Sequence, residues 1–252
     1  MLEHLYWALA IFVLLLAGAA LGVALRRRLP AHLVDDSAKD VVRLGMGLLA
    51  TIAALVISLL INSSYALYEA QRNDLNTLAA DAIHLDGLLR LYGDEARPAR
   101  EFLRPSLART VEHLWSGANL DHFRESSTAG EQAYLVILNL KPQNDVQATL
   151  KAQAIHLTTM FAQSRLRLFE RADPDQPMSL LVALTVWMVS LFVSYCLFSP
   201  LRRTSAVAVV FVALSVAAAM FLILELTQPF SGLIQLSDRP LSTALPPLPA
   251  VR

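Results

Sequence analysis

Four stretches of the chain combine high hydrophobicity with a complete lack of charged side chains. They are residues 5–25, 44–68, 176–201 and 204–224, each 21 to 26 residues long. An α-helix rises about 1.5 Å per residue, so about 20 apolar residues cross the hydrocarbon of a bilayer. Backbone polar groups at that depth must bond within their own segment. The pattern therefore predicts an all-α polytopic membrane protein with four transmembrane helices.

The second stretch is predicted to continue as a helix beyond the membrane. From residue 44 to residue 92 there is no proline, and Gly87 is the one glycine after Gly47. Gly93 is then expected to end the helix. The outer part of this helix carries a heptad pattern, which predicts packing against a partner along a 3.5-residue period. The heptad positions are Tyr68, Leu75, Ala82 and Leu89, alternating with Gln71, Leu78, Leu85 and Tyr92.

The residues between the second and third stretches are predicted to form a helical extramembrane domain. Pro98 suits the first turn of a helix that ends near Gly117, and a further helix is expected from about Asp145 to Arg171. The predicted division of the chain is 1–61 for the first two spans with a short basic loop, 62–178 for the helical domain, 179–226 for the last two spans, and 227–252 for an interfacial segment and proline-rich tail.

Small side chains are concentrated in the predicted spans. Gly18 and Gly22 form a GxxxG pair in the first span, and Ala213 and Ala217 repeat the four-residue spacing in the last. The second span carries Gly45, Gly47, Ala50, Ala54 and Ser58. Small residues allow helices to approach closely, and we expect ordinary packing within the bundle rather than a dedicated oligomer face.

Composition and charge narrow the class of protein. The chain is 55% hydrophobic and 17% charged, which excludes a wholly soluble protein. Its 21 basic and 21 acidic residues cancel, so we expect no nucleic-acid partner. The single cysteine, Cys196, allows no disulfide within the chain. Arginines 26, 27, 28, 202 and 203 lie in the two short loops and indicate that these loops are cytoplasmic. The N-terminus, the 62–178 domain and the C-terminus are therefore predicted to be periplasmic, in a bacterial inner membrane.

No spacing typical of a catalytic, metal or cofactor site is present, so we predict neither an enzyme nor a bound cofactor or metal. Polar residues at the span ends are the candidates for an ion pathway or a structural role. For Glu225 at the end of the fourth span we favour structural pairing over an ion pathway, and for Arg43 snorkelling over gating. Asn62 and Ser63 suit either a wet vestibule or a plain interface. Ser231 belongs to a short apolar segment that either lies at the interface or folds back toward a pore mouth.

Several motifs together resemble the bacterial bestrophin-like family of four-span membrane proteins. They are residues 42–51 (VRLGMGLLAT), residues 91–93 (LYG), residues 224–226 (LEL) with residues 229–234 (PFSGLI), and residues 240–241 (PL). The chain departs from the family pattern at Thr227, where an aspartate is expected, and at Arg202 and Arg203, which replace a milder polar turn. The threonine argues against an essential carboxylate pair at this site.

The resemblance implies a protein related to bestrophins, pentameric anion channels with four spans per subunit and a cytosolic helical domain between the second and third spans. That span order agrees with the apolar pattern, whereas the loop arginines here indicate a domain outside the cytoplasm. Our hypothesis is a homo-oligomeric ion channel or ion-conducting pathway in the lipid bilayer. The alternative is a non-conducting sensor or scaffold whose helical domain binds a protein partner, because the heptad pattern could serve such a contact.

Overall fold

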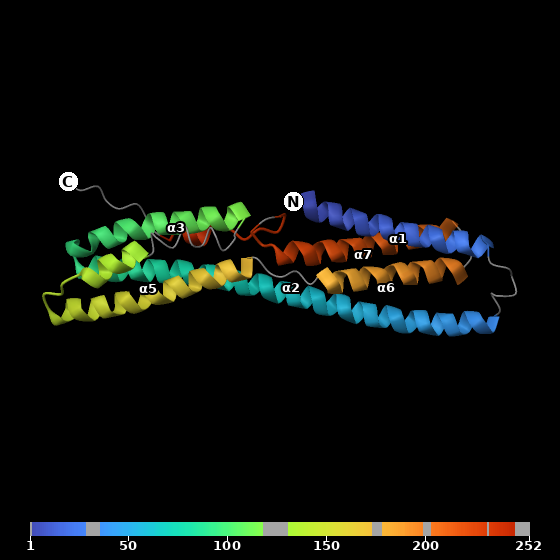
Figure 1. Ribbon diagram of the computed structural model, residues 1–252, viewed down its shortest axis with the longest axis horizontal. Helices are drawn as coiled ribbons and strands as arrows, with labels where there is room; N and C mark the ends of the chain where they lie inside the picture. Colours follow the sequence, from blue (N-terminus) through green and yellow to red (C-terminus); the bar gives the residue numbers. More distant parts are fainter. Residues whose placement is uncertain are drawn as a thin grey trace. The chain divides into compact units, whose positions relative to one another are not determined.

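The computed structural model describes residues 2–28, 36–117, 131–172, 178–198, 203–230 and 232–244, and these residues form helices and turns without a strand. Four of the helices are long and apolar enough to cross a membrane, which confirms the predicted all-α, four-span class. The helices shown in Figure 1 are α1 (Leu2–Arg28), α2 (Asp36–Tyr92), α3 (Arg97–Gly117), α5 (Asp145–Ala172), α6 (Met178–Phe198) and α7 (Arg203–Thr227). Two short helices, η2 (Asp94–Ala96) and α8 (Arg239–Ser242), and a helical stretch at residues 131–139 complete the set.

The chain divides into two compact units. A membrane unit comprises Met1–Ala66 and Asp175–Thr227, and an extramembrane unit comprises Leu67–Pro174 and Gln228–Arg252. Helix α2 contributes its first part to the membrane unit and its last part to the extramembrane unit, as the absence of proline over this range predicted. Gly93 follows with a φ of 123°, a backbone conformation that residues other than glycine rarely adopt. It ends the helix where predicted.

The membrane unit is organised around α1, which packs against α6 and α7. Gly18 and Gly22 face α6: a Cβ added at Gly18 would lie 3.0 Å from Val189 Cγ1, and one at Gly22 would lie 2.9 Å from Cys196 Cβ. The GxxxG pair therefore serves helix packing within the chain, as expected. Ala213 and Ala217 of α7 are buried in the same unit.

The extramembrane unit has its own apolar core, built from the last part of α2, α3, residues 131–139 and α5. The heptad residues of α2 lie in this core, with Leu75, Leu78, Ala82, Leu85 and Leu89 at most 1% exposed. Their partners are thus helices of the same chain. Asp86 on α2 accepts two hydrogen bonds from Arg100 on α3, at 2.8 and 3.0 Å, which fixes the angle between these helices.

The segment after α7 joins the extramembrane core. Phe230 contacts Trp115 of α3 edge-to-face with ring centroids 5.2 Å apart, and Leu236, Leu241 and Ala244 are buried in the same core. The sequence pattern predicts an interfacial segment and a proline-rich tail over residues 227–252. These four apolar side chains pack into the extramembrane core, and residues 231 and 245–252 lie outside the described part of the chain.

Candidate functional site

The membrane-crossing part of α2 is far less covered by its own chain than the other spans. In the most apolar window of α2, 11% of residues are buried, against 28% in α1 and α6 and 33% in α7. Between residues 40 and 66, the buried side chains are Ala53, Leu60 and Ser64. Most of the circumference of α2 in the membrane unit is therefore open to lipid, water or another protein chain.

One of these open faces carries polar side chains. Thr51, Ser58 and Asn62 are spaced by seven and four residues, which places them on one side of an α-helix, and all three are exposed. Ser58 and Asn62, together with Tyr65, line a groove of about 560 Å³ along α2. We call Thr51, Ser58 and Asn62 the polar stripe. The Thr51 hydroxyl donates to the Gly47 carbonyl at 2.9 Å within α2, so the polar groups of Ser58 and Asn62 are the ones that gain most from contact with water or protein.

Ser63 and Arg43 lie apart from the polar stripe. Ser63 is exposed, but one residue beyond Asn62 it is turned by about 100° and does not line the groove. Arg43 lies near the start of α2, where its Nη1 is 3.8 Å from Asp40 Oδ1; both side chains are at least 70% exposed, so this ion pair contributes little. Ser231, the remaining candidate of the C-terminal region, lies outside the described residues.

Glu225 is buried at the end of α7 and is paired. Its Oε2 lies 3.1 Å from Nδ1 of His4 at the start of α1, and the two side chains are 1% and 6% exposed. The hydroxyl of Thr227 donates to the Leu224 carbonyl at 2.8 Å, so it bonds within its own helix and supplies no second carboxylate. A buried carboxylate needs such a partner, because desolvation without one costs several kcal/mol.

His4 was missed by the sequence reasoning. A signal was present, because the first and fourth spans run in opposite directions and so bring the start of one to the level of the end of the other. A histidine and a glutamate at those two ends are a natural pair, but the order of neighbouring helices was needed to see it. The candidates thus do not form one cluster: Glu225 pairs with His4, while Asn62, Ser63 and Arg43 lie on α2.

Comparison with known proteins places this arrangement in a family. The profile of the bestrophin-like domain matches residues 13–241, which is nearly the whole chain. The chain belongs to the bestrophin-like family. His4 precedes the matched region, whereas the polar stripe and Glu225 lie within it.

Solved structures show the same fold. A crystal structure of a bacterial bestrophin homologue from Klebsiella pneumoniae carrying a tryptophan-to-alanine change is similar with a TM-score of 0.68 at 17% identity, over 95% of this chain and 93% of that one. Another structure of a bestrophin homologue from the same organism gives a TM-score of 0.65 at 16% identity, over 93% and 95%. No curated protein matches this chain significantly.

The extramembrane unit of this bestrophin-like chain contains ionisable groups whose pKa is shifted by burial. Burial raises the pKa of Asp81. Three neighbours act in the opposite direction: the Ser164 hydroxyl, which lies 3.5 Å from Asp81 Oδ2, and the electrostatic effects of His84 and Arg167. Burial lowers the pKa of Arg165, which is 4% exposed and donates to Ser106 Oγ at 3.4 Å. These groups link α2, α3 and α5. Among the described residues, no three histidine, cysteine, aspartate or glutamate side chains are grouped so as to hold a metal.

Proposed function

We propose that this bestrophin-like protein assembles with copies of itself and forms an ion-conducting pathway across the membrane. The observation that carries the proposal is the polar stripe on the uncovered face of α2. Polar side chains at membrane depth are stabilised when they line a water-filled path or contact another chain. Around a symmetry axis, the same face of each copy would meet water at the centre of a ring.

The fold supports this proposal more than the alternative of a non-conducting scaffold. The alternative drew on the heptad pattern as a surface for a protein partner. Those heptad residues are buried in the core of their own chain, so they are not available for such a contact. The exposed surface that remains distinctive is that of α2 in the membrane unit.

The test is conductance of the purified full-length protein in planar bilayers. We expect currents in the wild type, and a severalfold lower conductance for Asn62→Leu, because an apolar side chain in a narrow wet path promotes dewetting. Ser63→Leu is the matched control, since Ser63 is exposed on the same helix but lies outside the groove. Absence of current under varied anions, cations, calcium and pH would overturn the proposal. A sealed dimer in nanodiscs would overturn it as well.

We further propose the bacterial inner membrane as the location, with the N-terminus, residues 62–178 and the C-terminus on the periplasmic side. The exposed Arg26, Arg27 and Arg28 at the end of α1 and Arg203 at the start of α7 support this orientation. They flank the short loops. The proposed division of the chain after residues 61, 178 and 226 rests on the charge-free stretches of the sequence. Bestrophins, by contrast, place the equivalent helical domain in the cytosol.

Cysteine labelling separates the two orientations. In a Cys196→Ala background, a membrane-impermeant maleimide is expected to label Arg109→Cys on α3 in intact spheroplasts, and to label Arg27→Cys on α1 after the membrane is opened. Both positions are exposed, whereas Cys196 is fully buried. The reverse labelling pattern would place the extramembrane unit in the cytosol and leave the conductance proposal unaffected.

A further inference from the structure

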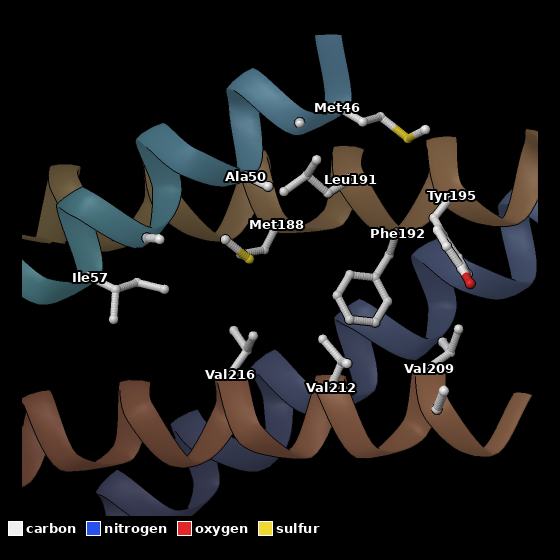
Figure 2. A pocket seen from close by; sticks show the side chains of 13 residues that line it. Met46, Ala50, Ile57, Met188, Leu191, Phe192, Tyr195, Val209, Val212 and Val216 are labelled. Atoms are coloured by element: carbon white, nitrogen blue, oxygen red, sulfur yellow. The ribbon is translucent and has the colours of Figure 1, made fainter. Parts of the chain in front are cut away.

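A second feature of the membrane unit is an apolar cavity between α2, α6 and α7. Its volume is about 570 Å³, within the range of about 300–1,000 Å³ that holds a small-molecule ligand. Gly47, Ala50 and Ala54 of α2 line it, together with Met188 and Phe192 of α6 and Val212 of α7. Figure 2 shows Ala50 on one side of the cavity and Val212 on the other. The lining is apolar almost throughout, with Tyr195 as the one residue that carries a side-chain hydroxyl.

The small side chains of α2 leave this space open. A Cβ added at Gly47 would meet no atom within 4 Å, so no neighbouring helix closes on α2 there. Gly18 and Gly22 of α1 behave differently, because α6 lies directly against them. In α2, glycine and alanine therefore make room for something that the chain itself does not supply.

The cavity extends over a depth that matches one leaflet of a bilayer. Its α2 wall runs from Met46 to Ile57, and at 1.5 Å per residue this is about 16 Å, or about half of a hydrocarbon core about 30 Å thick. Water has too few polar partners in such a space, and an empty cavity forfeits dispersion contacts. In a membrane, the apolar molecule at hand is a lipid acyl chain.

Basic side chains lie beyond one end of the cavity. Figure 2 shows Met46, Tyr195 and Val209 toward this end, with Ile57 and Val216 toward the other. Arg43 precedes Met46 by three residues on α2, and Arg203 opens α7 five residues before Ala208. Both arginines are exposed.

Arg26, Arg27 and Arg28 of α1 lie at the same end of the membrane unit. His4 of α1 pairs with Glu225 at the opposite end of α7, so the two helices are antiparallel and the end of α1 is level with the start of α7. Asp40 offsets part of this charge through its exposed pair with Arg43. The excess of positive charge remains, and it complements a phosphate headgroup.

We propose that the cavity is a binding site for an anionic glycerophospholipid, whose acyl chain lies between α2, α6 and α7 and whose headgroup contacts Arg43 and Arg203. The groove lined by Ser58 and Asn62 continues from this cavity through Ala54 and Ile57, so a helix from a second copy is the alternative occupant. The arginines beyond the other end of the cavity favour the lipid, because they complement its phosphate. The proposal depends on the membrane location of the chain and not on conduction.

The test uses the full chain in nanodiscs containing phosphatidylcholine with a small fraction of a diazirine-labelled probe lipid, either phosphatidylglycerol or phosphatidylcholine. After irradiation, we expect mass spectrometry to find phosphatidylglycerol attached to peptides that contain Met188, Phe192 or Val212. Ala50→Leu with Ala208→Leu fills the cavity and is expected to abolish most of this labelling. Ala218→Leu is the matched control, because Ala218 is exposed on α7 but does not line the cavity.

The headgroup contact has a separate readout that does not depend on filling the cavity. Arg43→Gln with Arg203→Gln is expected to lower the preference for phosphatidylglycerol over phosphatidylcholine by up to about thirtyfold, since each of the two basic residues near a membrane surface contributes about 1 kcal/mol. Labelling that is unchanged when the cavity is filled would overturn the acyl-chain site. Equal labelling of wild type by the two lipids would overturn the anionic preference. Cross-links between copies from engineered Ala208→Cys, without lipid labelling, would assign the cavity to a second copy and overturn the proposal.

Discussion

The two halves of α2 are one continuous helix with opposite relations to the rest of the chain. From residue 67 to residue 92 the helix buries Gln71, Leu75, Leu78 and six further side chains in the extramembrane core. From residue 40 to residue 66 it buries three, and Leu44, Leu55 and Leu59 are more than 60% exposed. Apolar residues are frequent in both halves, so hydrophobicity alone does not explain the difference.

The solvent around each half of α2 explains this difference in burial. In water, a helix with an apolar stripe gains about 25 cal/mol per Å² of apolar surface that it buries, so the stripe must be covered by other protein. In a bilayer, lipid tails are as apolar as leucine, so an exposed leucine loses nothing. Exposure is therefore uninformative for the leucines of the membrane half and for Thr51, whose hydroxyl bonds to the Gly47 carbonyl, and it is informative for Ser58 and Asn62. The exposed leucines of the membrane half therefore need no functional explanation, whereas the polar stripe does.

The largest expected effect comes from shortening the same side chain in both halves. Leu78→Ala removes a leucine that is 0% exposed in the extramembrane core and is expected to lower the free energy of unfolding by about 2–5 kcal/mol. Leu59→Ala, at 74% exposure in the membrane half, is expected to change it by less than about 0.5 kcal/mol. Thermal unfolding of the detergent-solubilised protein measures both. Equal losses would mean that the membrane half of α2 is covered in the assembled protein.

A smaller effect is expected from the buried pair of the membrane unit. Glu225→Ala removes the buried carboxylate that pairs with His4 and is expected to cost about 1–3 kcal/mol, whereas Glu225→Gln keeps an acceptor for the imidazole N–H and should cost less. The control is Glu101→Ala in the extramembrane unit. Glu101 pairs with Arg97 at 3.2 Å, but the side chains are 55% and 38% exposed, so a loss of at most about 1 kcal/mol is expected. Similar losses for Glu225→Ala and Glu101→Ala would show that burial does not strengthen the His4 contact.

The four spans and the length of α2 could be predicted because each depends on local sequence. A run without charge enforces a helix in lipid, and a long stretch without proline lets that helix continue to Gly93. The heptad positions were also predicted as a packing surface. The sequence could not predict that their partners belong to the same chain, because periodicity shows that a stripe is buried but does not show which helices cover it.

Small residues show the limit of sequence reasoning most clearly. In the sequence, α1 and α2 carry a similar pattern of small residues, which are Gly18 and Gly22 on α1 and Gly47, Ala50 and Ala54 on α2. In the structure, the first pair holds α6 in contact, and the second set borders an open cavity. The outcome depends on which helices are neighbours and how closely they cross, and a single sequence does not contain that information. The His4–Glu225 pair was missed for the same reason.

The smallest expected effect concerns the protonation of Asp81, which belongs to the part of α2 surrounded by its own chain. Burial raises its folded-state pKa above the ordinary value of 3.8, so between 3.8 and the raised pKa the folded protein holds more protons than the unfolded chain. Stability at this site therefore falls as pH rises through that window. Asp81→Asn removes the ionisation while its amide oxygen can still accept from Ser164, so the variant is expected to be more stable than wild type at neutral pH, by less than about 1 kcal/mol because the site is partly exposed. The gain should vanish below pH 3.8, where both forms are neutral.

Thermal midpoints from acid to neutral pH measure the difference, with Glu112→Gln at an exposed site of α3 as the control for net charge. A variant less stable than wild type at neutral pH would mean that the attraction of His84 and Arg167 outweighs the burial of Asp81, and that this half of α2 is wetter than its packing implies.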